Sequence, residues 1–370
     1  MSDKQYGVSA EKSTGEVAAP ALDYMPRVPE SYKPKIGLIG AGNISSFHLT
    51  AYKALGLDVT AICDQFPKSA EAKQREFYPD AIVYTDYRKL LEDAAIEVVD
   101  ITTHPDVRFE IIEAALRANK HVLSQKPFVT DLAQGRHLID LAEKHGVKLA
   151  VNQNGRWAPH FRYMTLAVDQ GLIGTVNTID FSLQWDQTWI AGNEGFESIR
   201  HMVLYDFAIH WFDITCRIMK GRRPKTVYAA INRFAEQVYR PAALAHVVID
   251  YDDAQVRMNF NAHNTYGEED ATTIAGTRGL LRSRGPRLTE QSVNLYTDAG
   301  QASPKLQGHW FENGFQGSMG ELLCAIDEDR EPEHSARDNL SSLELCFAAL
   351  ASADSGHSVK PGSVMIAAEN

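Results

Sequence analysis

The sequence predicts an α/β protein in which a doubly wound parallel sheet is followed by an α+β domain with a large, mostly antiparallel open sheet. Short apolar runs alternate with helical stretches up to about residue 154, and segments of alternating polarity dominate after it. A chain of 370 residues is also long enough for two domains of ordinary size. We expect an N-terminal arm at 1–33, the first domain at 34–154 and the second at 155–370.

The arm is rich in Ser, Ala, Glu and Pro and has little periodicity. Such a segment does not supply a hydrophobic core of its own. It is therefore either disordered or wrapped around another subunit, and the sequence does not choose between these two states.

The first domain is predicted from six apolar runs separated by amphipathic stretches. The expected strands are 35–40, 58–63, 81–84, 97–102, 121–124 and 148–153, and helical spacing is clearest at 45–55, 107–119 and 133–146. Strands that alternate with helices are joined by right-handed crossovers, so this sheet should be parallel and covered on both faces.

The second domain has expected helices at about 160–171 and about 200–219. Alternating polar and apolar residues predict strands at 175–185, 226–234, 242–251, 254–263 and 271–283. These segments are typical of an antiparallel meander with one covered face. Helical spacing returns at 318–329 and 339–356.

Composition argues against several classes of partner. The formal net charge is -11 at pH 7 and Lys and Arg form no cluster, so nucleic acid is not an expected partner. No apolar run approaches the roughly 18 residues that span a bilayer, and no signal-peptide pattern is present, so we expect a cytoplasmic protein without membrane association. The 4 cysteines form no C-x-x-C pair and are expected to be reduced and structural. The histidines form no H-E-x-x-H set, so no catalytic metal is expected.

The segment KIGLIGAGNISSFH carries a dinucleotide-binding pattern of the Rossmann type, because Gly40 and Gly42 follow the first strand and precede a helix. Gly40 permits a tight turn, and Gly42 lets the backbone approach a pyrophosphate at the helix N-terminus. The third position is Ser45, a small residue that still allows close packing. A turn without a ligand is the alternative.

Asp64 follows the second strand at the distance where an acid binds the adenosine ribose. A carboxylate there repels a 2′-phosphate, so NAD is favoured over NADP, although Lys68 leaves some room for NADP. The residues expected to hold the cofactor are Gly40, Gly42, Asn43, Ile44, Asp64, Thr103, His104, Gln125, Lys126 and Asn154.

The chain resembles the Gfo/Idh/MocA family, the glucose-fructose oxidoreductase and inositol dehydrogenase group, in VVDITTHPDVRFEIIEAALRANKHVLSQKP, NQNGRWAPHF, DFAIHWFDI and NLSSLELCFAALASADSG. The resemblance covers nearly the whole chain and implies an oxidoreductase that forms a homodimer or homotetramer through the open sheet. Two residues depart from the family pattern. Gln125 replaces the glutamate of Glu-Lys-Pro, which could alter the electrostatics around Lys126, and Arg108 stands where many members have a histidine.

Lys126, Asp206 and His210 are the expected catalytic residues. Asp206 and His210 are four apart, so a helix presents both on one face. Oxidation of an alcohol also removes the hydroxyl proton, which a histidine accepts well near neutral pH. Asp206 would orient the imidazole or contact a substrate hydroxyl. Lys126 ends a strand at the edge where parallel sheets bind ligands, and there it would polarise the reacting oxygen. A plain strand end and a surface i,i+4 pair are the structural alternatives.

The substrate is expected where the first domain passes into the second, in an interdomain cleft. Aromatic faces beside polar groups suit a polyhydroxylated ring, whose C–H face is apolar and whose rim is polar. The expected substrate-binding residues are Arg156, Trp157, His160, Trp185, Tyr205 and His210, with Asp186 and Trp189 close by. Core or subunit-interface packing is the alternative for the tryptophans.

Together these observations predict an NAD-dependent oxidoreductase that transfers a hydride between a secondary hydroxyl of a sugar, glycoside or cyclitol and the nicotinamide. The resemblance leaves two other functions open. Some relatives use bound NAD for transient oxidation during glycosidic bond cleavage, and galactose-pathway repressors share the fold as non-catalytic regulators. The presence of Lys126, Asp206 and His210 argues against a regulator.

Overall fold

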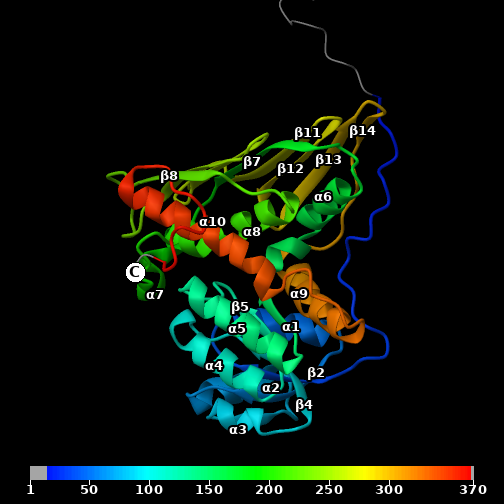
Figure 1. Ribbon diagram of the computed structural model, residues 1–370, viewed down its shortest axis with the longest axis vertical. Helices are drawn as coiled ribbons and strands as arrows, with labels where there is room; N and C mark the ends of the chain where they lie inside the picture. Colours follow the sequence, from blue (N-terminus) through cyan, green and yellow to red (C-terminus); the bar gives the residue numbers. More distant parts are fainter. Residues whose placement is uncertain (1–14, 368–370) are drawn as a thin grey trace, which may run out of the picture.

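The computed structural model describes residues 15–367, which form two sheets with a layer of helices between them (Figure 1). The first domain lies at one end of the molecule and the large second sheet at the other. None of the helices in this described part is long and apolar enough to cross a membrane.

The first sheet has six parallel strands in the order β3-β2-β1-β4-β5-β6. Its strands are β1 (Lys35–Ile39), β2 (Asp58–Cys63), β3 (Ile82–Tyr84), β4 (Ile96–Ile101), β5 (His121–Gln125) and β6 (Leu149–Asn152). The direction of strand addition reverses between β1 and β4, and ligands bind at the carboxyl ends of strands at such a reversal. The predicted parallel sheet is confirmed.

Helices α1 (Ser45–Ala54), α2 (Pro67–Phe77), α3 (Tyr87–Leu91), α4 (Pro105–Arg117) and α5 (Leu132–His145) connect these strands. Local sequence explains their ends. Asp86 and Asp131 cap α3 and α5 by accepting hydrogen bonds from backbone N–H groups of the first turn. Gly146 ends α5 in the left-handed conformation, with φ at 67°, which glycine adopts without strain.

The second sheet has eight strands in the order β14-β13-β12-β11-β7-β10-β9-β8. Its strands are β7 (Val176–Gln184), β8 (Thr226–Asn232), β9 (Leu244–Asp250), β10 (Gln255–Asn261), β11 (Glu269–Gly276), β12 (Gly279–Arg287), β13 (Glu290–Thr297) and β14 (Gly300–Ala302). The prediction of a purely antiparallel meander was wrong at β7, which pairs in parallel with β10 and antiparallel with β11. The expected strand 271–283 is two strands, and the polar strands β13 and β14 were missed.

The helical layer contains η2 (Asn154–Trp157), α6 (Pro159–Asp169), η3 (Thr188–Ile190), α7 (Glu194–Glu197), η4 (Val203–Phe207), α8 (Ile209–Ile218), α9 (Trp310–Asp327) and α10 (Ala336–Ser355). The helix expected at about 200–219 is interrupted, because η4 is a π-helical turn and α8 begins only at Ile209. Single π turns are often found at functional sites.

Helix α9 connects the end of the chain to the first domain. Its residues Phe315, Met319 and Leu322 share a buried cluster with Ile36 and Leu38 of β1. The core of the first domain is therefore completed by a helix that follows the second sheet in sequence.

Residues 15–33 of the expected arm run along the edge of their own chain, from β14 down to the first domain (Figure 1). The Val17 N–H donates to the Gln301 carbonyl at 2.9 Å, and the Tyr163 hydroxyl donates to the Pro20 carbonyl at 3.0 Å. The rest of the arm, residues 1–14, lies outside the described residues.

Candidate functional site

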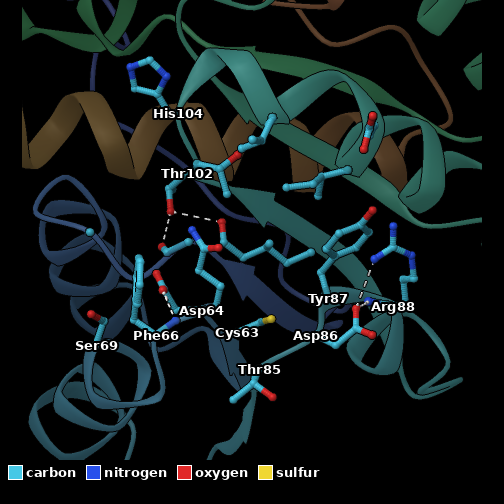
Figure 2. A pocket seen from close by; sticks show the side chains of 18 residues that line it. Cys63, Asp64, Phe66, Ser69, Thr85, Asp86, Tyr87, Arg88, Thr102 and His104 are labelled. Atoms are coloured by element: carbon cyan, nitrogen blue, oxygen red, sulfur yellow. Dashed lines mark hydrogen bonds and ion pairs between the residues drawn. The ribbon is translucent and has the colours of Figure 1, made fainter. Parts of the chain in front are cut away.

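A pocket of about 750 Å³ lies at the carboxyl ends of β1, β2 and β4 (Figure 2). Gly40, Gly42, Asp64, Thr103 and His104 of the expected cofactor set line it. Gly40 has φ at 100°, and a Cβ atom there would lie 2.9 Å from the backbone of Thr103. A Cβ atom on Gly42 would meet nothing within 4 Å, so the space above its backbone is open. This cradle fits a dinucleotide.

Helix α1 begins beside this pocket, directly after Asn43 and Ile44, which form the preceding turn. No side chain caps its first turn, and the backbone N–H groups of Ser45, Ser46 and Phe47 donate to carbonyls of the preceding turn. The N–H groups of Gly42, Asn43 and Ile44 donate to no acceptor among the described residues, which leaves them for a phosphate. Ser45 is fully buried, and its hydroxyl donates to the Gly42 carbonyl at 2.6 Å. Serine at the third motif position therefore packs closely and also ties down the glycine turn.

Asp64 stands at the end of β2 with its carboxylate held by the backbone. Oδ2 accepts from the Ala41 N–H at 2.7 Å, and Oδ1 accepts from the Phe66 N–H at 2.8 Å. Each carboxylate oxygen can accept a second hydrogen bond, so ribose hydroxyls can still be bound. Lys68 is exposed and does not line the pocket.

The end of the pocket around Asp64 contains residues that the sequence analysis missed. Phe66 and Val107 are 64% and 53% exposed, and Tyr87 stacks under Arg88 with the guanidinium 4.5 Å from the ring centre. Figure 2 shows Phe66 on one side of Asp64 and Tyr87 and Arg88 on the other. These residues follow β2, β3 and β4, so the rule that ligands bind at carboxyl ends of parallel strands would have indicated them.

Lys126 follows β5, and its side chain reaches the π turn of the second domain. Its Nζ donates to Asp206 Oδ1 at 2.8 Å and to the Asp206 carbonyl at 2.9 Å. The two side chains are 16% and 20% exposed. Asp206 thus holds Lys126 and not the imidazole of His210, which differs from the expectation. Asp206 lies in the π turn that precedes α8, and this turn accounts for the difference because it breaks the regular i,i+4 spacing to His210.

His210 lies in the first turn of α8, near this ion pair. Its Nδ1 is buried and has no hydrogen-bond partner among the described residues. Burial lowers the pKa of His210 well below its usual value, and the charge of Lys126 lowers it further. The ring of Trp310, at 5.6 Å between centroids, forms an apolar wall beside it. A neutral imidazole, a cation and a carboxylate are therefore gathered where the two domains meet.

Arg108, one of the two departures from the family pattern, is 2% exposed. Its guanidinium donates to the carbonyls of Thr103, Gln125 (2.8 Å) and Pro127. Burial lowers the pKa of Arg108 to about 10, so the side chain stays charged at neutral pH. The arginine links the Thr103 turn of the cofactor pocket to both sides of Lys126.

Tyr205, Gln125 and Asn154 are buried close to this region. Burial raises the pKa of the Tyr205 hydroxyl, whose surroundings include the charges of Arg108 and Asp206. Gln125 is 6% exposed and directs its amide into the first domain, away from solvent. Asn154 is 4% exposed in η2, and its carbonyl packs against Gly314 of α9.

Three expected substrate residues lie in the interior of the second domain instead. Arg156 is 2% exposed and donates to both carboxylate oxygens of Asp213, at 2.6 and 2.7 Å, so its guanidinium serves an internal ion pair. Trp157 packs against His334, and Trp185 packs against Trp211. We do not include these three in the proposed substrate site, because their polar or aromatic faces are occupied by the protein.

The remaining expected residues near the substrate, His160, Asp186 and Trp189, differ in their exposure to solvent. His160 is buried, its Nε2 has no partner among the described residues, and burial lowers its pKa to about 3. Asp186 accepts hydrogen bonds from the N–H and hydroxyl of Thr188. Trp189 is 53% exposed in η3, where its ring packs against Phe196. Across residues 15–367, no group of three or more His, Cys, Asp or Glu side chains is placed to hold a metal ion.

Two family models match this chain. The model described as "Oxidoreductase family, NAD-binding Rossmann fold" matches residues 34–153, and the model of the GFO/IDH/MocA C-terminal domain matches residues 161–282. The chain belongs to the Gfo/Idh/MocA family. Its predicted membership is thus confirmed, and the protein is an NAD-binding oxidoreductase of this type.

Individual relatives agree with this assignment. An inositol 2-dehydrogenase/D-chiro-inositol 3-dehydrogenase of Lactiplantibacillus plantarum is 33% identical over 320 residues, covering 82% of this chain and 86% of the relative. A D-apiose dehydrogenase of Paraburkholderia graminis is 28% identical, covering 88% and 89%. An oxidoreductase of Agrobacterium radiobacter, solved with NAD+, L-tartaric acid and magnesium, superposes with a TM-score of 0.81 at 22% identity, covering 90% of this chain and 99% of that structure.

Proposed function

We propose that this family member oxidises a secondary hydroxyl of a sugar, glycoside or cyclitol with NAD, yielding a keto-sugar or inosose. The observation that carries the proposal is the placement of Lys126, paired with Asp206 at 2.8 Å, beside a neutral His210. The names of the inositol and apiose dehydrogenases among the relatives support this substrate class. We further propose that the protein works in the cytoplasm as a homodimer or homotetramer.

The chain's own residues would divide the work as follows. Lys126 donates a hydrogen bond to the reacting oxygen and stabilises the negative charge that develops there. Asp206 keeps the lysine in place, and His210 accepts the hydroxyl proton on a ring nitrogen. Tyr205 provides a further polar group near the substrate. Bound NAD supplies the hydride acceptor.

The glycine turn before α1, with the N–H groups of Gly42, Asn43 and Ile44, would hold the pyrophosphate, and Asp64 would hold the adenosine ribose. The orientation of Asp64 by two backbone N–H groups supports a preference for NAD over NADP, because a fixed carboxylate repels a 2′-phosphate. Thr103, His104 and Lys126 are the proposed contacts toward the nicotinamide end.

The test is a panel of inositols, aldoses and glucosides assayed with NAD and with NADP by NADH or NADPH absorbance. The proposal expects reduced cofactor to form in proportion to a polyol consumed, and the His210→Ala variant to form at least a hundredfold less per unit time. Turnover of an aryl glycoside without net NADH would instead favour glycosidic bond cleavage. Tight NAD binding without turnover of any compound would favour a regulator.

A further inference from the structure

A buried polar chain runs beneath Lys126 across four elements of the first domain. It joins His48 of α1, Asp100 of β4, Gln125 of β5 and Asn152 of β6, and the exposed fraction of each is at most 6%. Buried polar groups are costly unless their hydrogen bonds are made, so the direction of each bond in the chain is informative.

The direction can be worked out from one unambiguous donor. The backbone N–H of Lys126 donates to Gln125 Oε1 at 2.7 Å, which fixes the oxygen of that amide. The other end of the amide is therefore the NH₂ group, and it lies 3.3 Å from His48 Nε2. The Asn152 amide nitrogen is a second donor, 3.2 Å from the same His48 atom and 3.3 Å from Gln125 Oε1. His48 Nε2 must accept and carries no proton.

The opposite side of the imidazole has the complementary partner. His48 Nδ1 lies 2.7 Å from Asp100 Oδ2, which also accepts from the Tyr52 hydroxyl at 2.6 Å. A carboxylate that already accepts from Tyr52 calls for a proton on His48 Nδ1. Phe315 of α9 covers the ring at 4.5 Å and adds no charge. From Lys126 through Gln125 and His48 to Asp100, each group then donates to the next one in the line.

We propose that His48 is a positioning residue that acts on Lys126 through Gln125, as a neutral imidazole with its proton fixed on Nδ1. The inference deepens the proposed function and rests on it for the role of Lys126. Gln125 is an amide and does not ionise. His48 is therefore the one ionisable side chain in the line of hydrogen bonds that connects Asp100 with the backbone of Lys126. The glutamine that departs from the family pattern is thus the residue that keeps this connection free of charge.

Replacement of Gln125 by glutamate shows why the amide matters. Glutamate has no N–H to donate, so a carboxylate oxygen would face the unprotonated Nε2 of His48. One additional proton, on His48 or on the new carboxyl group, is needed to restore the bond. We expect Gln125→Glu to add an ionisation to the pH dependence of kcat/KM that the native protein lacks, and to lower turnover about tenfold or more through displacement of Lys126. Gln255→Glu, the same change at an exposed site of β10, should do neither.

The deciding experiment is neutron diffraction on deuterated native protein, together with the pH profiles of both variants and fluorescence titrations with NAD. Deuterium on His48 Nδ1 with none on Nε2 is the expected result. Deuterium on Nε2 would overturn the proposed chain, and a Gln125→Glu profile identical to the native one would overturn the positioning role. Failure of the proposed dehydrogenase function would appear differently, as absence of turnover with the neutron result unchanged.

Discussion

At the residue scale, three side chains carry the proposed chemistry, and the structure changes how they are paired. Asp206 was expected to orient His210 or the substrate, but it holds Lys126 at 2.8 Å. Gln125 offers Lys126 no negative charge, and the second domain supplies that charge through Asp206. No carboxylate in residues 15–367 binds His210, and its surroundings are the apolar ring of Trp310 and the charge of Lys126.

This environment predicts the pH dependence of the reaction. The pKa of His210 is lowered by burial and by Lys126, so the imidazole is in its proton-accepting form throughout the neutral range. Loss of activity through protonation of His210 should therefore occur only as the pH falls well below about 6.5, the ordinary histidine value. A profile of kcat/KM against pH measures this. The prediction is contradicted if the native profile has an acidic limb centred near pH 6.5 and a His210 variant with residual activity lacks that limb.

We predict that one residue, Asp64, decides the choice between NAD and NADP. Asp64→Ser should narrow the preference for NAD over NADP, because it removes the charge that repels a 2′-phosphate. The ratio of kcat/KM values for the two cofactors measures the change, with exposed Asp253→Ser as a control far from the pocket. If native protein prefers NADP, the assignment of Asp64 to the ribose is wrong.

At the element scale, β11 contains a group with no evident role in the reaction. Asp270 is fully buried, and neither carboxyl oxygen has a partner within residues 15–367. The hydroxyls of Thr272 and Ser283, on the same sheet, also have no hydrogen-bond partner in the described part of the chain. Burial raises the pKa of Asp270 to about 8, and the charge of Glu269 adds to this. The folded protein therefore keeps this acid protonated at neutral pH.

Stability should consequently fall with rising pH. The pKa of an unfolded aspartate is about 3.9, so the stabilising protonation is fully present below that value and is lost as the pH rises toward about 8. Asp270→Asn removes this dependence. Between pH 5 and pH 8 the native protein should lose on the order of 3 kcal/mol relative to the variant, measured by urea unfolding. Parallel stability curves for the two proteins would show that Asp270 is ionised in the fold.

The arm is the second element with a testable role. Residues 15–33 lie against β14 and α6 of their own chain, and Leu22 is 9% exposed. We predict that deletion of residues 1–33 lowers the thermal midpoint and changes oligomer mass before it changes turnover. Light scattering and thermal unfolding of the truncated protein measure both effects. An unaltered mass would remove the arm from assembly, and an unaltered midpoint would show that its contacts contribute little.

At the scale of the whole molecule, the sequence was a good guide where local patterns decide the structure. Alternating strands and helices, Gly40 and Asp64 were enough for the first domain and its pocket. The place of β7 between β10 and β11 was not predictable, because strand order depends on contacts between segments far apart in sequence. The same reason explains the missed return of α9 to the first domain and the pairing of Lys126 with Asp206. Arg156 and Trp185 were expected in the cleft because composition does not distinguish a buried polar or aromatic residue from a ligand contact.

The central claim is that Lys126 and His210 act together on one hydroxyl group. The most direct measurement is the rate of NADH formation in a single turnover by the native protein, His210→Ala, Lys126→Ala and the double variant, each saturated with NAD and the best substrate of the panel. Each single change should slow NADH formation at least a hundredfold. The double variant should be slowed by much less than the product of the two single factors, because both residues act on the same hydroxyl group. A near-native rate in His210→Ala, or fully multiplicative effects in the double variant, would contradict the account.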